Sequence, residues 1–437
     1  MFMFLTFDKY TEEGIEALKR GVSHLNAHLP FLTGVVVPSS QSGGKENVCE
    51  VQPASASFLQ TYPMLQVESH PELDYTAPDD FIDQKYLPLP FFMSPAEPQP
   101  LIRFKANVTN TKVILSVAYF HKALDSTAVS VAVRALAELC KDPNTSPELL
   151  PTSVSAEESS RQHLLDFAAQ SPVPFNWTLT PPTFDPPPED PGKIPVSQHF
   201  KLSAEKISFL KNACNASLSS SEVDLPPLTS NDIITALIGL CGNRARLSTV
   251  PDYIPPSPKV IIAANVRKQS LLSATYSGNA LSAVEASYDA SIFPEGTTLS
   301  DGLSASLDSA DFTRLANIAC NLRKEITALT EAYISGILRT IADTRDMTTF
   351  FPAYGRSIIV SSLRWMDFYL DFGALGRVQE YDIPETKVKG VCWVLPAKDL
   401  GDIKRTAKQA FELRFVLERA AMKQLKGDKL FQWVSEE

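Results

Sequence analysis

A proline-rich stretch divides this chain of 437 residues into two unequal parts. Residues 172–195 contain nine prolines among 24 positions. Proline fixes the backbone angle φ and lacks an amide hydrogen, so such a run forms neither a helix nor a central strand. We expect residues 171–198 to be a semi-rigid crossover linker. The sequence therefore predicts an N-terminal domain over 1–170 and a C-terminal domain over 199–437.

Both parts mix helical and strand patterns. Residues 12–28 place apolar side chains at helical spacing, and residues 113–120 form a nearly all-apolar run that suits a buried strand. Further helices are predicted over 128–140, 229–240 and 418–426, and further strands over 259–264, 357–362 and 411–417. This intermixing predicts layered α/β domains, each with a sheet and packed helices.

The overall charge limits the classes of partner. Forty Lys and Arg against fifty Asp and Glu give a formal net charge of −10, without a basic tail. Binding to nucleic acid or to an anionic membrane needs cationic patches, so we expect neither partner. No apolar run reaches the roughly 18 residues of a membrane span, and the first residues do not resemble a secretory leader. We expect a monomer in the cytoplasm.

The cysteines and histidines do not predict a metal site. The six cysteines are at least 27 positions apart, which fits neither a zinc motif nor a disulfide framework. His24 and His28 are four apart on a predicted helix, a spacing that can ligate a metal. Because no third ligand is close in sequence, we expect an exposed helix face there instead.

The segment with the clearest chemical content begins where the strand predicted over 113–120 ends. His121 follows at once, and a helix is predicted to begin just after Asp125. A side chain at the carboxyl end of an inner strand leaves the sheet from a fixed backbone, which suits a catalytic group. Imidazole titrates near neutral pH, so His121 can act as a general base, and Asp125 can orient the ring or brace the loop. On this segment alone, a structural histidine and an Asp N-cap are the commoner interpretation.

Taken with several further segments, this one resembles the BAHD superfamily of CoA-dependent acyltransferases, in particular its fungal, trichothecene 3-O-acetyltransferase-like branch. The HxxxD motif is His121 to Asp125. The other matching segments, in family order, are 29–34 (LPFLTG), 228–236 (LTSNDIITA), 265–267 (NVR), 278–280 (GNA), 361–373 (SSLRWMDFYLDFG) and the C-terminal 413–431. HxxxD alone is a common chance match, whereas the ordered set covers nearly the whole chain.

The resemblance implies an architecture and a reaction. Two chloramphenicol-acetyltransferase-like domains, each a mixed β-sheet with flanking helices, would enclose an active-site channel with the histidine near its middle. Acyl-CoA, with acetyl-CoA the commonest donor, and a small apolar alcohol or amine would meet there. His121 would take the proton of the acceptor as it attacks the thioester, and CoA would leave without an acyl-enzyme. Holding both substrates in one channel raises their effective concentration.

The same resemblance gives supporting roles to residues far from the motif. Arg267 would pair with Asp125, which would then point away from the reacting atoms and hold the shape of the loop. Asp371 and Gly373 fall in a segment similar to the family's DFGWG motif, whose role is structural and which lies away from the histidine.

Contacts to the substrates are less sharply indicated. Ser361, Ser362 and Asn279 are candidates for contact with the oxyanion or the substrate. Leu363 stands where many family members carry Trp, which removes an indole donor. Arg377, just after the DFG-like segment, is a candidate for a CoA phosphate.

Two alternatives to this reaction remain open from the sequence. The first is acyl transfer from a carrier-protein thioester, as in related condensation domains, but Phe120 and Ser126 depart from their HHxxxDG motif. The second is a non-catalytic binding protein that kept the fold. Retention of His121, Asp125 and Arg267 favours an enzyme, because a decayed site has no reason to keep three separated partners.

Overall fold

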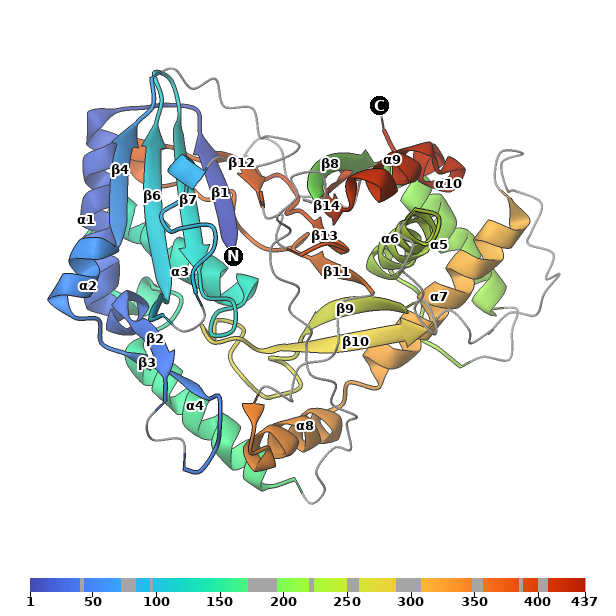
Figure 1. Ribbon diagram of the computed structural model, residues 1–437, viewed down its shortest axis with the longest axis horizontal. Helices are drawn as coiled ribbons and strands as arrows, with labels where there is room; N and C mark the ends of the chain where they lie inside the picture. Colours follow the sequence, from blue (N-terminus) through green and yellow to red (C-terminus); the bar gives the residue numbers. More distant parts are fainter. Residues whose placement is uncertain are drawn as a thin grey trace.

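Two mixed sheets organise the fold of the computed structural model (Figure 1). The structure describes residues 1–39, 43–71, 84–94, 97–171, 195–219, 224–249, 259–287, 308–347, 357–384, 388–399 and 408–436. Most of the linker predicted over 171–198 lies outside these residues, so its conformation and the domain boundaries stay predictions.

The N-terminal sheet has the strand order β12-β1-β7-β6-β4. Strand β4 is parallel to β6, and the other neighbours are antiparallel. Its strands are β1 (Phe2–Phe7), β4 (Leu65–Ser69), β6 (Ile102–Val108), β7 (Val113–Tyr119) and β12 (Val378–Asp382). Strand β7 is buried along its whole length, as the apolar run predicts. A small separate sheet joins β2 (Val35–Pro38), β3 (Cys49–Gln52) and β5 (Gln99–Pro100).

The C-terminal sheet has the order β10-β9-β11-β13-β14-β8. Strand β11 is parallel to both of its neighbours, and the other pairs are antiparallel. Its strands are β8 (Val196–Leu202), β9 (Lys259–Asn265), β10 (Leu281–Ser287), β11 (Ile358–Ser362), β13 (Val391–Val394) and β14 (Phe411–Leu417). The three strands predicted in this half correspond to β9, β11 and β14, so the mixed α/β architecture is confirmed.

Helices flank both sheets (Figure 1). They are α1 (Glu12–His28), α2 (Ala56–Thr61), α3 (Ser126–Lys141), α4 (Val154–Ala169), α5 (Ala204–Ser219), α6 (Ser230–Leu247), α7 (Ser309–Thr327), α8 (Glu331–Asp343), α9 (Arg419–Gly427) and α10 (Lys429–Val434). Helices α1 and α3 pack together beside the N-terminal sheet, and α4 contacts α8. Within the described residues, none of the helices is both long and apolar enough to cross a membrane.

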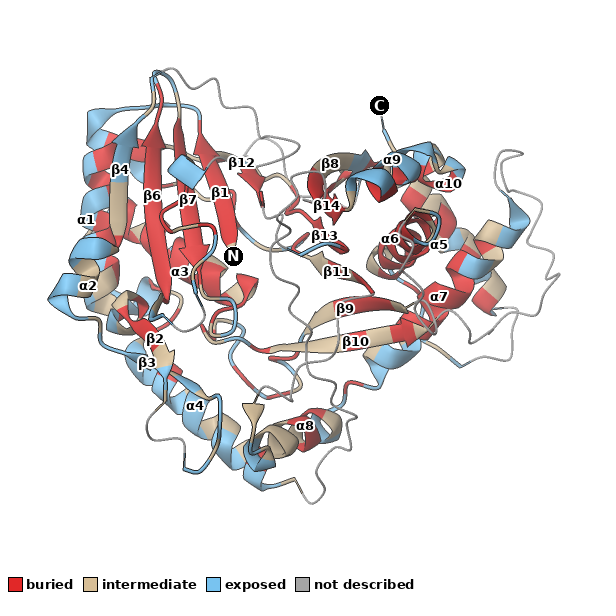
Figure 2. Cartoon of the chain, in the orientation of Figure 1, coloured by how far each residue is buried: buried red, intermediate tan, exposed pale blue. Residues whose placement is uncertain are grey.

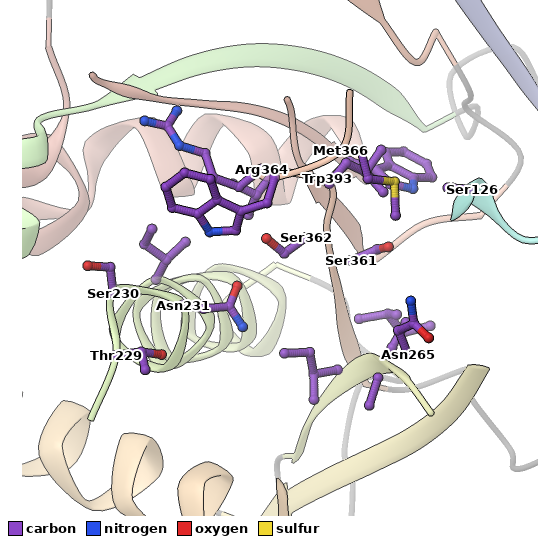
Figure 3. Close-up of a pocket in the computed structure, with 18 of the residues that line it drawn as sticks. Ser126, Thr229, Ser230, Asn231, Asn265, Ser361, Ser362, Arg364, Met366 and Trp393 are labelled. Atoms are coloured by element: carbon purple, nitrogen blue, oxygen red, sulfur yellow. The ribbon is translucent and has the colours of Figure 1, made fainter. Parts of the chain in front are cut away.

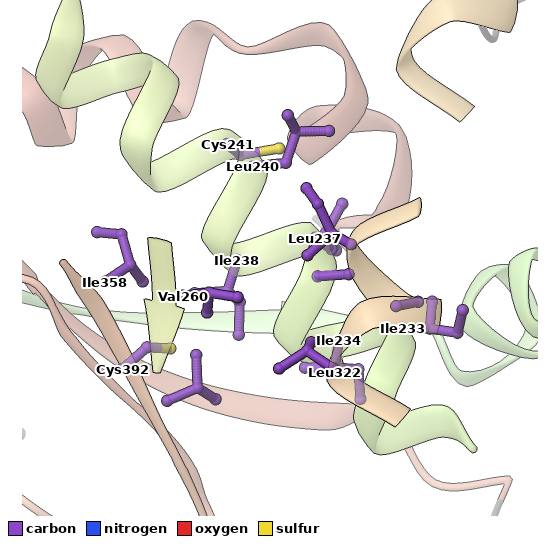
Figure 4. Close-up of a cluster of buried hydrophobic side chains, with 14 of the residues drawn as sticks. Ile233, Ile234, Leu237, Ile238, Leu240, Cys241, Val260, Leu322, Ile358 and Cys392 are labelled. Atoms are coloured by element: carbon purple, nitrogen blue, oxygen red, sulfur yellow. The ribbon is translucent and has the colours of Figure 1, made fainter. Parts of the chain in front are cut away.

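Helix α6 is the centre of the C-terminal core. Nearly every residue from Asp232 to Arg246 is buried, because the helix has neighbours on all sides. Figure 4 shows Ile238 close to Val260 of β9, and Ile234 close to Leu322 of α7. The N-terminus of α6 is fixed by a capping box between Thr229 and Asp232. A rigid α6 with a defined first turn results.

The DFG-like loop lies on the N-terminal half, although the sequence places it in the C-terminal domain. Phe372 packs edge-on against Phe7 of β1, with ring centroids 5.1 Å apart, and β12 then pairs with β1. Gly373 and Gly376 have φ of 66° and 90°, which side chains other than glycine rarely adopt. Residues 371–382 therefore cross back from the second half and complete the first sheet.

The six cysteines and the two histidines of α1 all lie within the described residues. All six cysteines are unpaired, and only Cys49 is exposed. His24 lies on the exposed face of α1, whereas the ring of His28 lies 2.8 Å from the backbone oxygen of Thr152. Because a carbonyl oxygen only accepts, His28 donates from Nε2 and acts as a structural link between α1 and the segment before α4.

Candidate active site

A cavity of about 1190 Å³ lies between the two halves. The N-terminal half contributes His121, Ser126 and Thr127 to its wall, and the C-terminal half contributes parts of β9, β11 and β13 and the first turn of α6 (Figure 3). Most of the lining side chains are apolar, and the described lining residues include Lys211 and Arg364 but no Asp or Glu. The wall therefore suits an apolar ligand and does not repel an anion.

His121 stands two residues beyond the end of β7 and is open to this cavity. Its Nδ1 lies 3.2 Å from the backbone oxygen of Leu124, and a carbonyl oxygen can only accept a hydrogen bond. This contact assigns the proton to Nδ1 in the neutral ring and leaves the lone pair on Nε2. The ring opens on the cavity, but the protein around that cavity partly desolvates it, and this desolvation lowers the pKa of His121 below its ordinary value of 6.5. The neutral, proton-accepting form therefore prevails at neutral pH.

Asp125 and Arg267 form a buried, two-pronged ion pair. Arg267 donates to the two carboxylate oxygens over 2.8 and 2.9 Å, and the side chains are 0% and 3% exposed. The carboxylate also accepts from the backbone amides of Ala128, where it caps α3, and of Ala280. All of these contacts lie behind the histidine loop, so Asp125 fixes backbone instead of facing the cavity.

Arg267 and Asn279 tie the connection between β9 and β10 to the histidine loop. Besides Asp125, Arg267 donates to the backbone oxygens of Tyr276 and Gly278. Asn279 donates from its side chain to the backbone oxygen of His121 over 2.7 Å, and its own amide donates to that of Ala123. It is not among the described residues of the cavity wall, so the structure gives it a loop-holding contact where the sequence suggested a substrate contact.

Ser361 and Ser362 do line the cavity, at the carboxyl end of β11. Figure 3 shows their hydroxyls on opposite sides of the strand, Ser361 on the side of Asn265 and Ser362 on the side of Asn231. This alternation is the ordinary pleat of a strand. The cavity wall to which His121 belongs thus also offers hydroxyl donors from the C-terminal half.

The remaining predicted residues lie elsewhere. Asp371 accepts from the amide of Gly373 and shapes the DFG-like loop. Arg377 donates to the backbone oxygen of Tyr369 over 2.7 Å. The described cavity wall contains neither Asp371 nor Gly373 nor Arg377. The structure therefore brings His121 together with Ser361 and Ser362 and leaves Arg377 apart.

Two tryptophans of the cavity wall were missed from the sequence. Trp393 stands opposite Ser361 in the pairing of β13 with β11, and Trp365 follows the serine pair closely in sequence. Trp365 is 65% exposed although it is a large apolar side chain, because it faces the cavity. The sequence could have indicated Trp365, because it is one of only four tryptophans and stands three residues beyond Ser362, a predicted substrate contact.

Comparisons with known proteins agree with this geometry. A family model, the Transferase family, matches residues 1–428. The chain belongs to this family, the BAHD acyltransferases. Communesin N16 acyltransferase cnsK of Penicillium expansum is 28% identical over 97% of this chain and 91% of its own length. Fumigaclavine B O-acetyltransferase easN of Aspergillus fumigatus is 28% identical over 99% of this chain and 94% of its own length.

Solved structures share the fold. TRI101 of F. graminearum, solved with coenzyme A and T-2 mycotoxin, superimposes with a TM-score of 0.71 at 17% identity, over 100% of this chain and 95% of that one. Vinorine synthase superimposes with a TM-score of 0.61 at 16% identity, over 100% of this chain and 90% of that one. The predicted family, fold and enzyme class are thereby confirmed: this BAHD member is an acyl-CoA-dependent acyltransferase.

Proposed function

We propose that this acyltransferase moves an acetyl group from acetyl-CoA to a hydroxyl of a small apolar metabolite, with His121 as the general base. One observation carries the proposal. The ring of His121 opens on the cavity, and its Nδ1 is engaged by the backbone oxygen of Leu124, so its free Nε2 is the proton acceptor. General-base help of this kind is typically worth about 10²–10⁴ in rate.

The step transfers one proton and exchanges one bond. Nε2 of His121 takes the hydroxyl proton while the oxygen attacks the thioester carbonyl carbon. The tetrahedral oxyanion collapses, the carbon–sulfur bond breaks, and the CoA thiolate leaves and recovers the proton from the imidazolium. No acyl-enzyme forms, so the chain needs no nucleophilic Ser or Cys. Ser361 and Ser362, which line the same cavity, are our candidates for donation to the oxyanion.

The cavity favours a hydroxyl acceptor over an amine. A basic amine is protonated at neutral pH and would gain from a carboxylate in the wall, but the described lining residues include none. An uncharged alcohol needs a base instead, and His121 supplies one. Relatives acting at both kinds of atom are known, since easN is named for O-acetylation and cnsK for acylation at nitrogen.

The apolar wall indicates the rest of the acceptor. The indoles of Trp365 and Trp393 offer large, flat surfaces, which bind apolar rings well. We therefore infer a bulky, largely apolar ring system around the reacting hydroxyl.

The test is product formation with a defined donor. Purified protein is incubated with acetyl-CoA and a panel of polycyclic alcohols and amines, and free CoA and acetylated product are measured by mass spectrometry. Acceptor-dependent acetyl ester supports the proposal. Transfer from an acyl-carrier protein but not from acetyl-CoA would favour the carrier alternative, and tight binding of the panel without turnover would favour a binding protein.

A further inference from the structure

Helix α4 carries a buried carboxylate that the reaction does not use. Glu157 is 1% exposed, whereas most of the helix faces solvent. Its carboxylate accepts from the hydroxyl of Thr152 over 2.7 Å and from the backbone amide of Ser277 over 3.0 and 3.1 Å. Ser277 is 120 positions away in sequence and belongs to the other half of the chain.

Glu157 has no cationic partner among the described residues. No ion pair joins it to a Lys or Arg there, so its direct contacts are hydrogen bonds. Burying a charge in this way is costly unless its oxygens are well supplied with donors. The amide of Ser277 reaches both oxygens, and in the part of the chain that the structure describes it is the only donor from outside the turn that precedes α4. The carboxylate is therefore committed to the backbone at Ser277.

That backbone position stands in the middle of the clamp on the histidine loop. Ser277 lies between Tyr276 and Gly278, whose carbonyl oxygens accept from Arg267. Two residues further on, Asn279 donates to the backbone oxygen of His121. Figure 1 shows the β9–β10 connection reaching from the C-terminal sheet toward α3 and α4.

We propose that Glu157 is a positioning residue for the acyl transfer. It holds segment 276–280 at the amide of Ser277, so that Arg267 and Asn279 meet Asp125 and His121 in one register. The inference rests on the proposed function, because it assigns the reason for the clamp to the placement of Nε2. Misplacing a catalytic group by about 1 Å can cost on the order of 10²-fold in rate.

The first test compares two neighbours on α4. Glu157→Ala should lower kcat about 10-fold to 100-fold and leave KM for acetyl-CoA within about 2-fold, because positioning is lost and binding surface is not. Glu158→Ala, on the exposed face, should match the wild type. Glu157→Gln keeps one acceptor oxygen and should recover part of kcat. If Glu157→Ala does not fold, Thr152→Val provides a milder change. It removes one donor to the Glu157 carboxylate and should also lower kcat.

A double-mutant cycle separates positioning from general stability. In an Asp125→Asn background the clamp is already weakened, so adding Glu157→Ala should cost less than about 3-fold more, since both changes act through one network. Fully multiplicative losses, or wild-type kcat in both Glu157→Ala and Thr152→Val, would overturn the proposal.

Hydrogen exchange tests the same inference without turnover. The amides of Ala128 and Ala280 donate to Asp125, and they should exchange faster in Glu157→Ala, or in Thr152→Val, but not in Glu158→Ala. Unchanged exchange would overturn the role of Glu157. If wild-type protein acetylates no acceptor, the proposed function fails, while the exchange result still decides on the clamp.

Discussion

Removing the cation of the buried pair gives the most quantitative prediction. In Arg267→Met the carboxylate of Asp125 stays at 0% exposure but keeps only the amides of Ala128 and Ala280 as donors. Leaving one buried charge of such a pair unpartnered costs about 3–5 kcal/mol. The carbonyls of Tyr276 and Gly278 also lose their donor, so the free energy of unfolding should fall by at least the lower figure.

A surface pair between β9 and β10 provides the control. Lys259 and Glu285 form an ion pair at 2.9 Å, but their side chains are 44% and 37% exposed. Lys259→Met should therefore cost only about 0–1 kcal/mol. Combining Arg267→Met with Asp125→Asn removes both buried charges and should regain part of the loss.

The assay is urea unfolding followed by tryptophan fluorescence, with the wild type and the three variants at one pH and salt concentration. The account predicts a midpoint for Arg267→Met well below that of Lys259→Met, and kcat reduced in the first variant only. If the two single variants lose the same free energy, within about 1 kcal/mol, the reasoning about burial is refuted.

Three further predictions concern the base, the acceptor and the loop. Because desolvation lowers the pKa of His121, kcat should decline as one proton binds, with a midpoint below pH 6.5. A decline centred above 6.5 would contradict the assignment. Trp365→Ala should raise KM about 10-fold for a polycyclic acceptor and little for a small alcohol; equal changes would count against stacking. A Cβ at Gly278 would lie 2.2 Å from the Tyr276 hydroxyl, so Gly278→Ala should cost about 1–3 kcal/mol in urea unfolding, whereas Gly427→Ala, with open space around it, should cost nothing.

Local sequence signals predicted much of the fold because single elements carry them. The helix predicted over 12–28 is α1, since Thr11 caps its first turn and its apolar stripe faces α3. The strand predicted over 411–417 is β14. Helix α4 was missed, because its exposed faces carry a weak apolar pattern.

Contacts between distant segments could not be predicted from periodicity. Nothing near residue 157 marks it as the partner of Ser277, because the contact depends on how the β9–β10 connection crosses to α4. The return of residues 371–382 to the first sheet is similar, since it depends on pairing with β1 at the other end of the chain. The resemblance of ordered motifs supplied the pairing of Asp125 with Arg267, which spacing alone does not indicate.

The most direct test of the account is acetyl transfer by His121→Ala beside His24→Ala, a change on the exposed face of α1. With the acceptor that the wild-type enzyme uses, and with saturating acetyl-CoA, we predict that kcat of His121→Ala falls by a factor of about 10²–10⁴ while His24→Ala keeps the wild-type value. An enzyme that acetylates its acceptor at the same rate without the imidazole at position 121 would contradict it.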